Sequence, residues 1–175
     1  MNATRTRPAW TRWIGFGAIA AVFAVTLAPF GPGIARAFAD FEFRAPDFSL
    51  WAQVSWVVKL HVYAALTALA IGTVILFRRK GSGFHKTLGW AWVLAMGTTA
   101  ISSLFIMEVN RGFFSFIHLL SGWTIIALPM AIFAIRNRKV DAHRRAMTGM
   151  FVGGLLVAGL LSFIPGRVMF EMFFG

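Results

Sequence analysis

The sequence contains no cysteine and few acidic residues, six in a chain of 175. The lack of cysteine excludes disulfides, thiolate metal sites and cysteine nucleophiles. Only 13 % of residues are charged and 58 % are hydrophobic, which is far from the composition of a soluble domain. There is also no nucleophile and base constellation, phosphate-binding loop or pair of carboxylates, so no catalytic residue is predicted and hydrolases and ATP-driven machines are disfavoured.

Long apolar runs dominate what is present. Each is long enough to cross a hydrocarbon core, which takes about 20 helical residues. Backbone groups in lipid must be satisfied within their own segment, so helices are predicted. The predicted transmembrane helices are 13–30, 51–77, 86–107, 113–135 and 144–164, with an external segment over 31–50 and one membrane domain over 1–175.

The first run also resembles a secretory signal, because a basic start precedes it and small residues follow at Ala35, Ala37 and Ala39. The run is long for a signal, so we favour a retained helix. Cleavage would leave four helices in the same orientation.

The net charge of +11 lies in short basic patches beside the apolar runs. The basic residues predicted on one side of the membrane are Arg5, Arg7, Arg12, Arg78, Arg79, Lys80, Lys86, Arg136, Arg138, Lys139, Arg144 and Arg145. Fewer basic residues lie on the other side, together with most of the acidic ones. The positive-inside rule therefore predicts a cytoplasmic amino terminus and a periplasmic carboxyl terminus. This pattern explains the charge without nucleic acid and makes the lipid bilayer the predicted partner.

Two stretches of the chain repeat one pattern: "HVYAALTALAIGTVILFRRKGSGFHK" and "HLLSGWTIIALPMAIFAIRNRKVDAHR". Each reads histidine, apolar helix, basic loop, and histidine followed by lysine or arginine. The second histidine, His85 or His143, follows the first arginine of its loop at the same spacing. We predict an all-α integral membrane protein with five transmembrane helices, the last four forming an antiparallel four-helix bundle from a duplicated helical hairpin.

The repeat places the four histidines in two pairs. At 1.5 Å per residue, His61 and His118 lie roughly 25 Å and 27 Å above the cytoplasmic arginines of their hairpins. These two therefore share the outer part of the bilayer. His85 and His143 share the cytoplasmic edge.

Paired histidines at equal height on facing helices are typical of bis-histidine haem sites. The expected cofactor is haem b, one or two per chain, with iron held by His61 and His118 and by His85 and His143. The residue one turn after each histidine is small in three of four cases: Ala65, Gly122 and Gly89, against Met147. The candidate partners of the haem propionates are Lys59, Arg111 and Arg167 outside and Lys86, Arg144 and Arg145 inside.

Other roles for these histidines stay open. His85 and His143 could be solvated among headgroups, and His61 and His118 could make hydrogen bonds between helices. Zinc or copper is disfavoured, because two imidazoles without nearby carboxylates or thiolates complete neither kind of site. A proton relay is weakened by the distance between the pairs.

From His61 onward the sequence resembles the DUF2306 family of small bacterial inner-membrane proteins, which are described only as predicted membrane proteins. The resemblance rests on "FHKTLGWAWV", "HLLSGWTIIALP", "AHRRAMTGMFVGGLLVAGL" and "PGRVM". It implies a multi-pass location in the bacterial inner (cytoplasmic) membrane and supplies no activity.

A looser resemblance is to di-haem transmembrane cytochromes of the b type, in which alternate helices of a four-helix core hold each haem. It implies electron transfer with a quinone or a redox partner protein, either as a membrane oxidoreductase or as an electron-transfer subunit. The alternative from another class is a haem-free membrane protein, a small transporter or a structural or accessory subunit of a larger membrane complex.

Overall fold

The computed structural model describes residues 31–32, 35, 46–106, 116–164 and 167–174. The chain divides into two compact units, Met1–Phe43 and Arg44–Gly175, and the second holds all four histidines. The predicted first helix, 13–30, and most of the predicted external segment, 31–50, lie outside the described residues.

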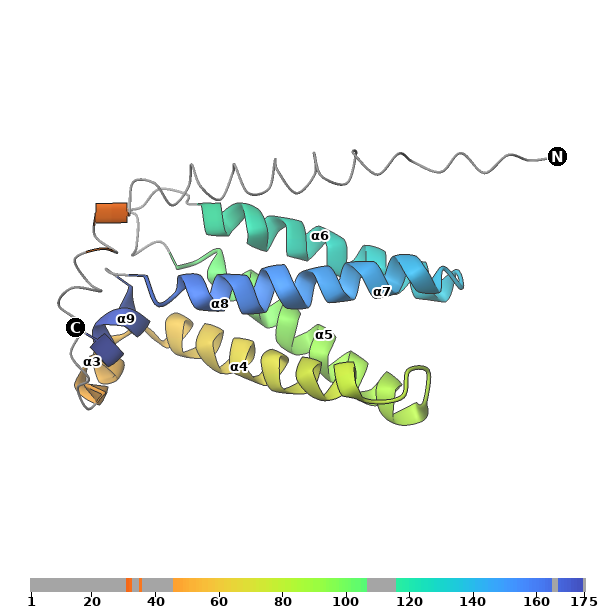
Figure 1. The fold of residues 1–175 in the computed structure, drawn as a ribbon, viewed down its shortest axis with the longest axis horizontal. Coiled ribbons are helices and arrows are strands. Elements are labelled where there is room, and N and C mark those ends of the chain that lie inside the picture. Colours follow the sequence, from red (N-terminus) through yellow and green to blue (C-terminus); the bar gives the residue numbers. More distant parts are fainter. Residues whose placement is uncertain (1–30, 33–34, 36–45, 107–115, 165–166, 175) are drawn as a thin grey trace. The chain divides into compact units, whose positions relative to one another are not determined.

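The described part of the second unit is helical and contains no strand (Figure 1). Its elements are α3 (Phe48–Gln53), α4 (Trp56–Phe77), α5 (Gly83–Ser103), α6 (Phe116–Arg136), α7 (Val140–Gly149), the π-helix η3 (Met150–Val157), α8 (Ala158–Leu161) and α9 (Val168–Phe174). Helices α7, η3 and α8 follow one another without a break in the chain. The prediction of an all-helical chain is confirmed for these residues.

Local sequence explains two boundaries that differ from the predicted ones. The run predicted over 51–77 is divided at Val54 and Ser55, both extended, so α3 ends before α4 begins. Helix α5 begins at Gly83 rather than at residue 86, because the side-chain oxygen of Ser82 accepts a hydrogen bond from the backbone N–H of His85 at 3.2 Å. A serine in this position caps the free amides of a first helical turn. The cap fixes His85 in the first turn of α5.

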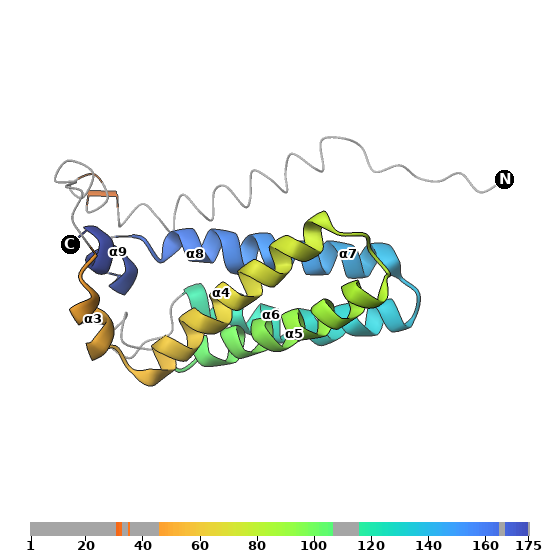
Figure 2. The same cartoon turned by 90° about the horizontal axis from the view of Figure 1, so that it is seen from below.

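The long helices pack in a closed series of neighbours: α4 on α5, α5 on α6, α6 on α7 and η3, and η3 on α4. Figures 1 and 2 show the α4–α5 and α6–α7 connections at the same end of these helices. The short helices α3 and α9 contact each other at the opposite end, where the Asp47 amide donates to the Met172 carbonyl at 2.9 Å.

A compact apolar core fills the middle of this unit. Its buried members are Ala68, Trp92, Met96, Leu128, Ala131, Met150, Phe151 and Leu155. Gly72 allows close approach here, because a Cβ added to it would lie 2.5 Å from the ring of Phe151 and 2.8 Å from the indole nitrogen of Trp92. The core therefore packs the ring of Phe151 directly against the backbone of α4.

Among the described residues, three helical stretches have the length and apolar composition needed to cross a membrane: Trp56–Phe77, His118–Arg136 and Val140–Leu161. Helix α5 is as long as α6 but is not one of the three; it carries His85 and Lys86 in its first turn and hydroxyl-bearing residues near its end. Large apolar side chains such as Leu94, Leu119 and Phe133 point outward and are about 70 % exposed (70 %, 71 % and 68 %). Lipid is the solvent that suits such a surface.

Candidate functional site: two histidine pairs

His61 is held by the helix that pairs with its own. From α4 its Nδ1 lies 3.0 Å from the Thr99 carbonyl oxygen and 3.2 Å from the Ser102 hydroxyl oxygen, both on α5. A carbonyl only accepts, so Nδ1 carries the proton and donates it. The Ser102 hydroxyl donates in turn to the Thr98 carbonyl at 2.6 Å. The lone pair of the neutral ring is therefore left on Nε2, the atom with which a histidine held in this way binds metal.

His118 lies on α6 and is buried, with 7 % of its surface exposed and its Nε2 enclosed. One turn further along, Ser121 is hydrogen-bonded to Ser103 of α5, with 2.5 Å between the hydroxyl oxygens. This bond joins the two hairpins beside His118.

The sequence reasoning missed a layer of buried hydroxyls around the outer pair. Its members are Thr99, Ser102, Ser103, Ser121 and Thr124. The signal was present in "TTAISS", where Thr99, Ser102 and Ser103 recur at the spacing of one helix face. The hydroxyls of the three α5 members, Thr99, Ser102 and Ser103, each donate to a carbonyl of their own helix. Their hydroxyl hydrogens therefore have acceptors although they are buried.

His143, like His61, is hydrogen-bonded through Nδ1 to a backbone carbonyl of the neighbouring helix. From α7 its Nδ1 lies 3.0 Å from the carbonyl oxygen of Ala131 on α6. The same argument places the proton on Nδ1 and the lone pair on Nε2. Each hairpin thus uses one histidine to tie its two helices together, His61 in the first and His143 in the second.

His85 occupies the first turn of α5, where its Nδ1 is buried and has no hydrogen-bond partner. A charge on His143 or on Lys80 is felt at His85, so the two histidines of this pair lie within electrostatic range of each other. A buried ring nitrogen without a partner is costly unless a ligand completes it.

The glycines beside two of the histidines leave room. A Cβ added at Gly89, one turn after His85, would meet no atom within 4 Å, and the same holds for Gly122, one turn after His118. By contrast, Ala65 and Met147, which follow His61 and His143, pack against the apolar core. Each predicted pair therefore joins one tied histidine to one histidine beside an open helix flank.

Each predicted pair would offer two imidazoles to a haem, and the open helix flanks at Gly89 and Gly122 each lie one turn after one of those histidines. The core residues Trp92, Met96 and Phe151 lie on the same helices between the two ends. Among the described residues no group of three or more histidine or acidic side chains could hold a bare metal ion.

The predicted propionate partners are in varied surroundings. The Lys59 ammonium donates to the Ala52 carbonyl at 3.2 Å, and burial lowers the pKa of the half-buried Arg167 guanidinium. Arg111 lies outside the described residues. On the other face Lys86 is exposed, and Arg144 pairs with Asp141 at 3.2 Å. Arg145 is exposed on α7.

Comparison with known proteins gives a family and no activity. No curated protein and no solved structure matches the chain. The family model of DUF2306, described as a predicted membrane protein, matches residues 58–173, which include all four histidines and helices α5 to α8 in full. The chain belongs to the DUF2306 family of predicted membrane proteins.

Proposed function

We propose that this protein binds haem b through two bis-histidine sites and passes electrons across the membrane. One observation carries the proposal: in each predicted pair, one imidazole is fixed through Nδ1 to a backbone carbonyl so that Nε2 keeps its lone pair. That imidazole is His61 in the outer pair and His143 in the inner pair. Histidines that ligate metals are oriented by this kind of bond.

The proposed membrane arrangement has five spans, with α4, α5, α6 and the continuous α7–η3–α8 forming an antiparallel four-helix bundle. The closed series of helix neighbours supports it, as do the two basic connections at one end. The positive-inside rule puts those connections in the cytoplasm of a bacterial inner membrane and the carboxyl terminus in the periplasm.

Within each site the residues would divide the work. His61 and His143 are fixed by their partner helices before any ligand arrives, whereas His118 and His85 supply the opposite imidazole beside Gly122 and Gly89. Bound haem would supply a one-electron redox centre at each end. The electron donor and acceptor would be a quinone or a redox protein that meets a haem edge at either membrane face.

The visible spectrum of detergent-purified protein tests this directly, recorded oxidised and then dithionite-reduced, with pyridine haemochrome quantification. We expect a sharp reduced α-band and two haems per chain. The His61→Gln and His118→Gln variants should each lose the outer haem. Thr73→Ala is the matched control, because this exposed threonine of α4 bonds only within its own helix. A colourless protein from haem-replete cells would refute the proposal.

A second candidate is a haem-free structural or accessory subunit. The same two hydrogen bonds also favour this candidate. The bonds from His61 to Thr99 and from His143 to Ala131 hold neighbouring helices together without any ligand. Interhelical hydrogen bonds of this kind contribute on average about 0.6 kcal/mol in membranes. This reading predicts a colourless protein in which His61→Ala and His143→Ala lower the stability of the fold and weaken co-purification with a partner.

A further inference from the structure

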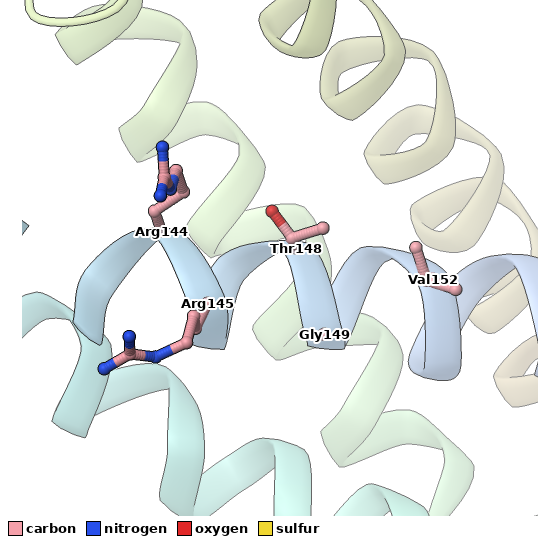
Figure 3. Close-up of a pocket in the computed structure, with 5 residues that line it drawn as sticks. All are labelled: Arg144, Arg145, Thr148, Gly149 and Val152. Atoms are coloured by element: carbon pink, nitrogen blue, oxygen red, sulfur yellow. The ribbon is translucent and has the colours of Figure 1, made fainter. Parts of the chain in front are cut away.

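A surface cavity of about 380 Å³ lies on α7 near the end that carries the basic connections. It is lined by Arg144, Arg145, Thr148, Gly149 and Val152 (Figure 3). All five residues are exposed, so the cavity opens outward rather than toward the histidines. It shares Arg144 and Arg145 with the predicted propionate partners of the inner haem but does not include His143.

The lining changes from charged to apolar along the helix. Figure 3 shows Arg144, Thr148 and Val152 projecting from one side of the helix, while Arg145 projects from the other side near Gly149. From Arg144 to Val152 the helix rises about 12 Å, roughly the depth from a headgroup to the first part of an acyl chain. The cavity thus offers guanidinium groups at its shallow end, then a hydroxyl, and then an apolar surface.

An aromatic side chain borders the glycine. A Cβ added at Gly149 would lie 3.9 Å from Cη2 of Trp123 on α6, and Trp123 is 45 % exposed. Because Gly149 has no side chain, the surface of the helix is flat beside the Trp123 indole. Indole rings are favoured at the boundary between headgroups and acyl chains.

A second cavity at the same end has the same chemistry. It measures about 350 Å³ and is lined by Arg78, Arg79, Ser82 and Phe84. Again two arginines accompany one hydroxyl and one apolar side chain. The guanidinium of Arg78 lies over the Phe84 ring at 5.9 Å from its centroid.

We propose that the α7 cavity binds a phospholipid with an anionic headgroup. The Arg144 guanidinium and the Thr148 hydroxyl, which project from the same side of the helix, would hold the phosphate. The Arg145 guanidinium would add positive charge at the same edge of the cavity, and the acyl chain would lie on Gly149 and Val152. Guanidinium suits phosphate because it donates several hydrogen bonds in a fixed geometry. The apolar half of the cavity distinguishes a lipid from free phosphate, which would leave Val152 without a partner.

Retention of lipid by the intact purified protein tests the site. Native mass spectrometry would compare bound phosphatidylglycerol with phosphatidylcholine, and then repeat the measurement with inorganic phosphate present. We expect phosphatidylglycerol to be retained at least tenfold better, with no displacement by millimolar phosphate. Equal retention of the two lipids would overturn the proposal, and displacement by phosphate would show an anion site without lipid specificity.

Three variants localise the effect. Arg144→Gln with Arg145→Gln should remove one retained phosphatidylglycerol and leave any lipid bound at the second cavity of Arg78 and Arg79. Arg136→Gln with Lys139→Gln removes the same charge near the same end and should leave retention unchanged. Gly149→Leu fills the cavity without changing charge and should also weaken retention. An unchanged number of retained phosphatidylglycerol molecules in both the Arg144→Gln/Arg145→Gln variant and Gly149→Leu would refute the assignment. The test does not require haem, so it can succeed or fail on a colourless protein.

Discussion

The two hairpins of the repeat, α4–α5 and α6 with α7–η3–α8, carry histidines at matching positions, but the inner two differ: His143 is hydrogen-bonded to the Ala131 carbonyl, whereas the buried Nδ1 of His85 has no hydrogen-bond partner. In the first hairpin the outer histidine, His61, binds its partner helix; in the second the inner histidine, His143, does so. The remaining two, His85 and His118, stand beside glycines with open space. The duplicated sequence has therefore not given identical contacts, and the inner pair is where the two halves differ.

The largest expected effect is on haem. His61→Gln should reduce the haem content from two to one per chain, because the amide can still donate to the Thr99 carbonyl but cannot serve as the iron ligand. His143→Gln should remove the other haem in the same way. Pyridine haemochrome quantification measures both. The control is the free energy of unfolding in detergent, which should fall for His61→Ala more than for His61→Gln. Full haem content in both glutamine variants would contradict the proposal.

The next largest effect concerns two glycines, Gly72 in α4 of the first hairpin and Gly154 in η3 of the second. Gly72→Ala in α4 should destabilise the fold by about 1–3 kcal/mol, because the new methyl group would overlap the rings of Phe151 and Trp92. A Cβ at Gly154 in η3 would crowd the terminal methyl of Met96 at 2.7 Å and would be in ordinary contact with the Thr124 hydroxyl oxygen at 3.7 Å. A methionine end moves easily. The free energies of unfolding should therefore differ clearly, and equal values would show that the Phe151 ring can also give way.

The helical character of the described residues followed from the sequence, because the length of an apolar run is a local property. The unequal use of the histidines did not. Whether His61 or His85 reaches a carbonyl depends on how α4 rotates against α5, and that rotation is set by tertiary packing around Gly72 and Trp92. The repeat predicted the same contacts for His85 as for His143. The packing of the helices gives these two residues different contacts.

The π-helix and the hydroxyl layer were also missed, for different reasons. η3 includes Gly153 and Gly154, residues that a sequence reading assigns to close packing, and nothing local distinguishes a π-helix from an α-helix there. The hydroxyls of Thr99, Ser102 and Ser103 could have been found from their spacing. Five spans stay a prediction, since the helix over 13–30 lies outside the described residues.

A smaller effect compares the two basic connections, α4–α5 and α6–α7. Gly81 has φ +80° in the first and Arg138 has φ 58° in the second, a left-handed conformation in both. Gly81→Ala should cost about 1–2 kcal/mol, because a Cβ is strained there. Arg138→Gly should be stabilising or neutral, since it relieves that strain while adding entropy to the unfolded chain. Detergent unfolding curves measure both variants, and a destabilised Arg138→Gly would mean that the arginine side chain itself stabilises the connection.

The smallest expected effect concerns the bond that joins the hairpins, Ser103 to Ser121. Both oxygens are buried. A hydroxyl has one hydrogen, so when Ser103 donates to the Ala100 carbonyl at 2.8 Å it accepts from Ser121, and removal of Ser121 leaves that carbonyl as its acceptor. A double-mutant cycle of Ser103→Ala and Ser121→Ala should give a coupling of about 0.6 kcal/mol, the average for interhelical hydrogen bonds in membranes. The cycle also tests the outer site, because Ser121 lies one turn from His118. If the single variants shift the reduced α-band or the redox potential of the outer haem while the inner haem is unchanged, the bond positions His118. If neither haem responds, the bond serves only to hold α5 against α6.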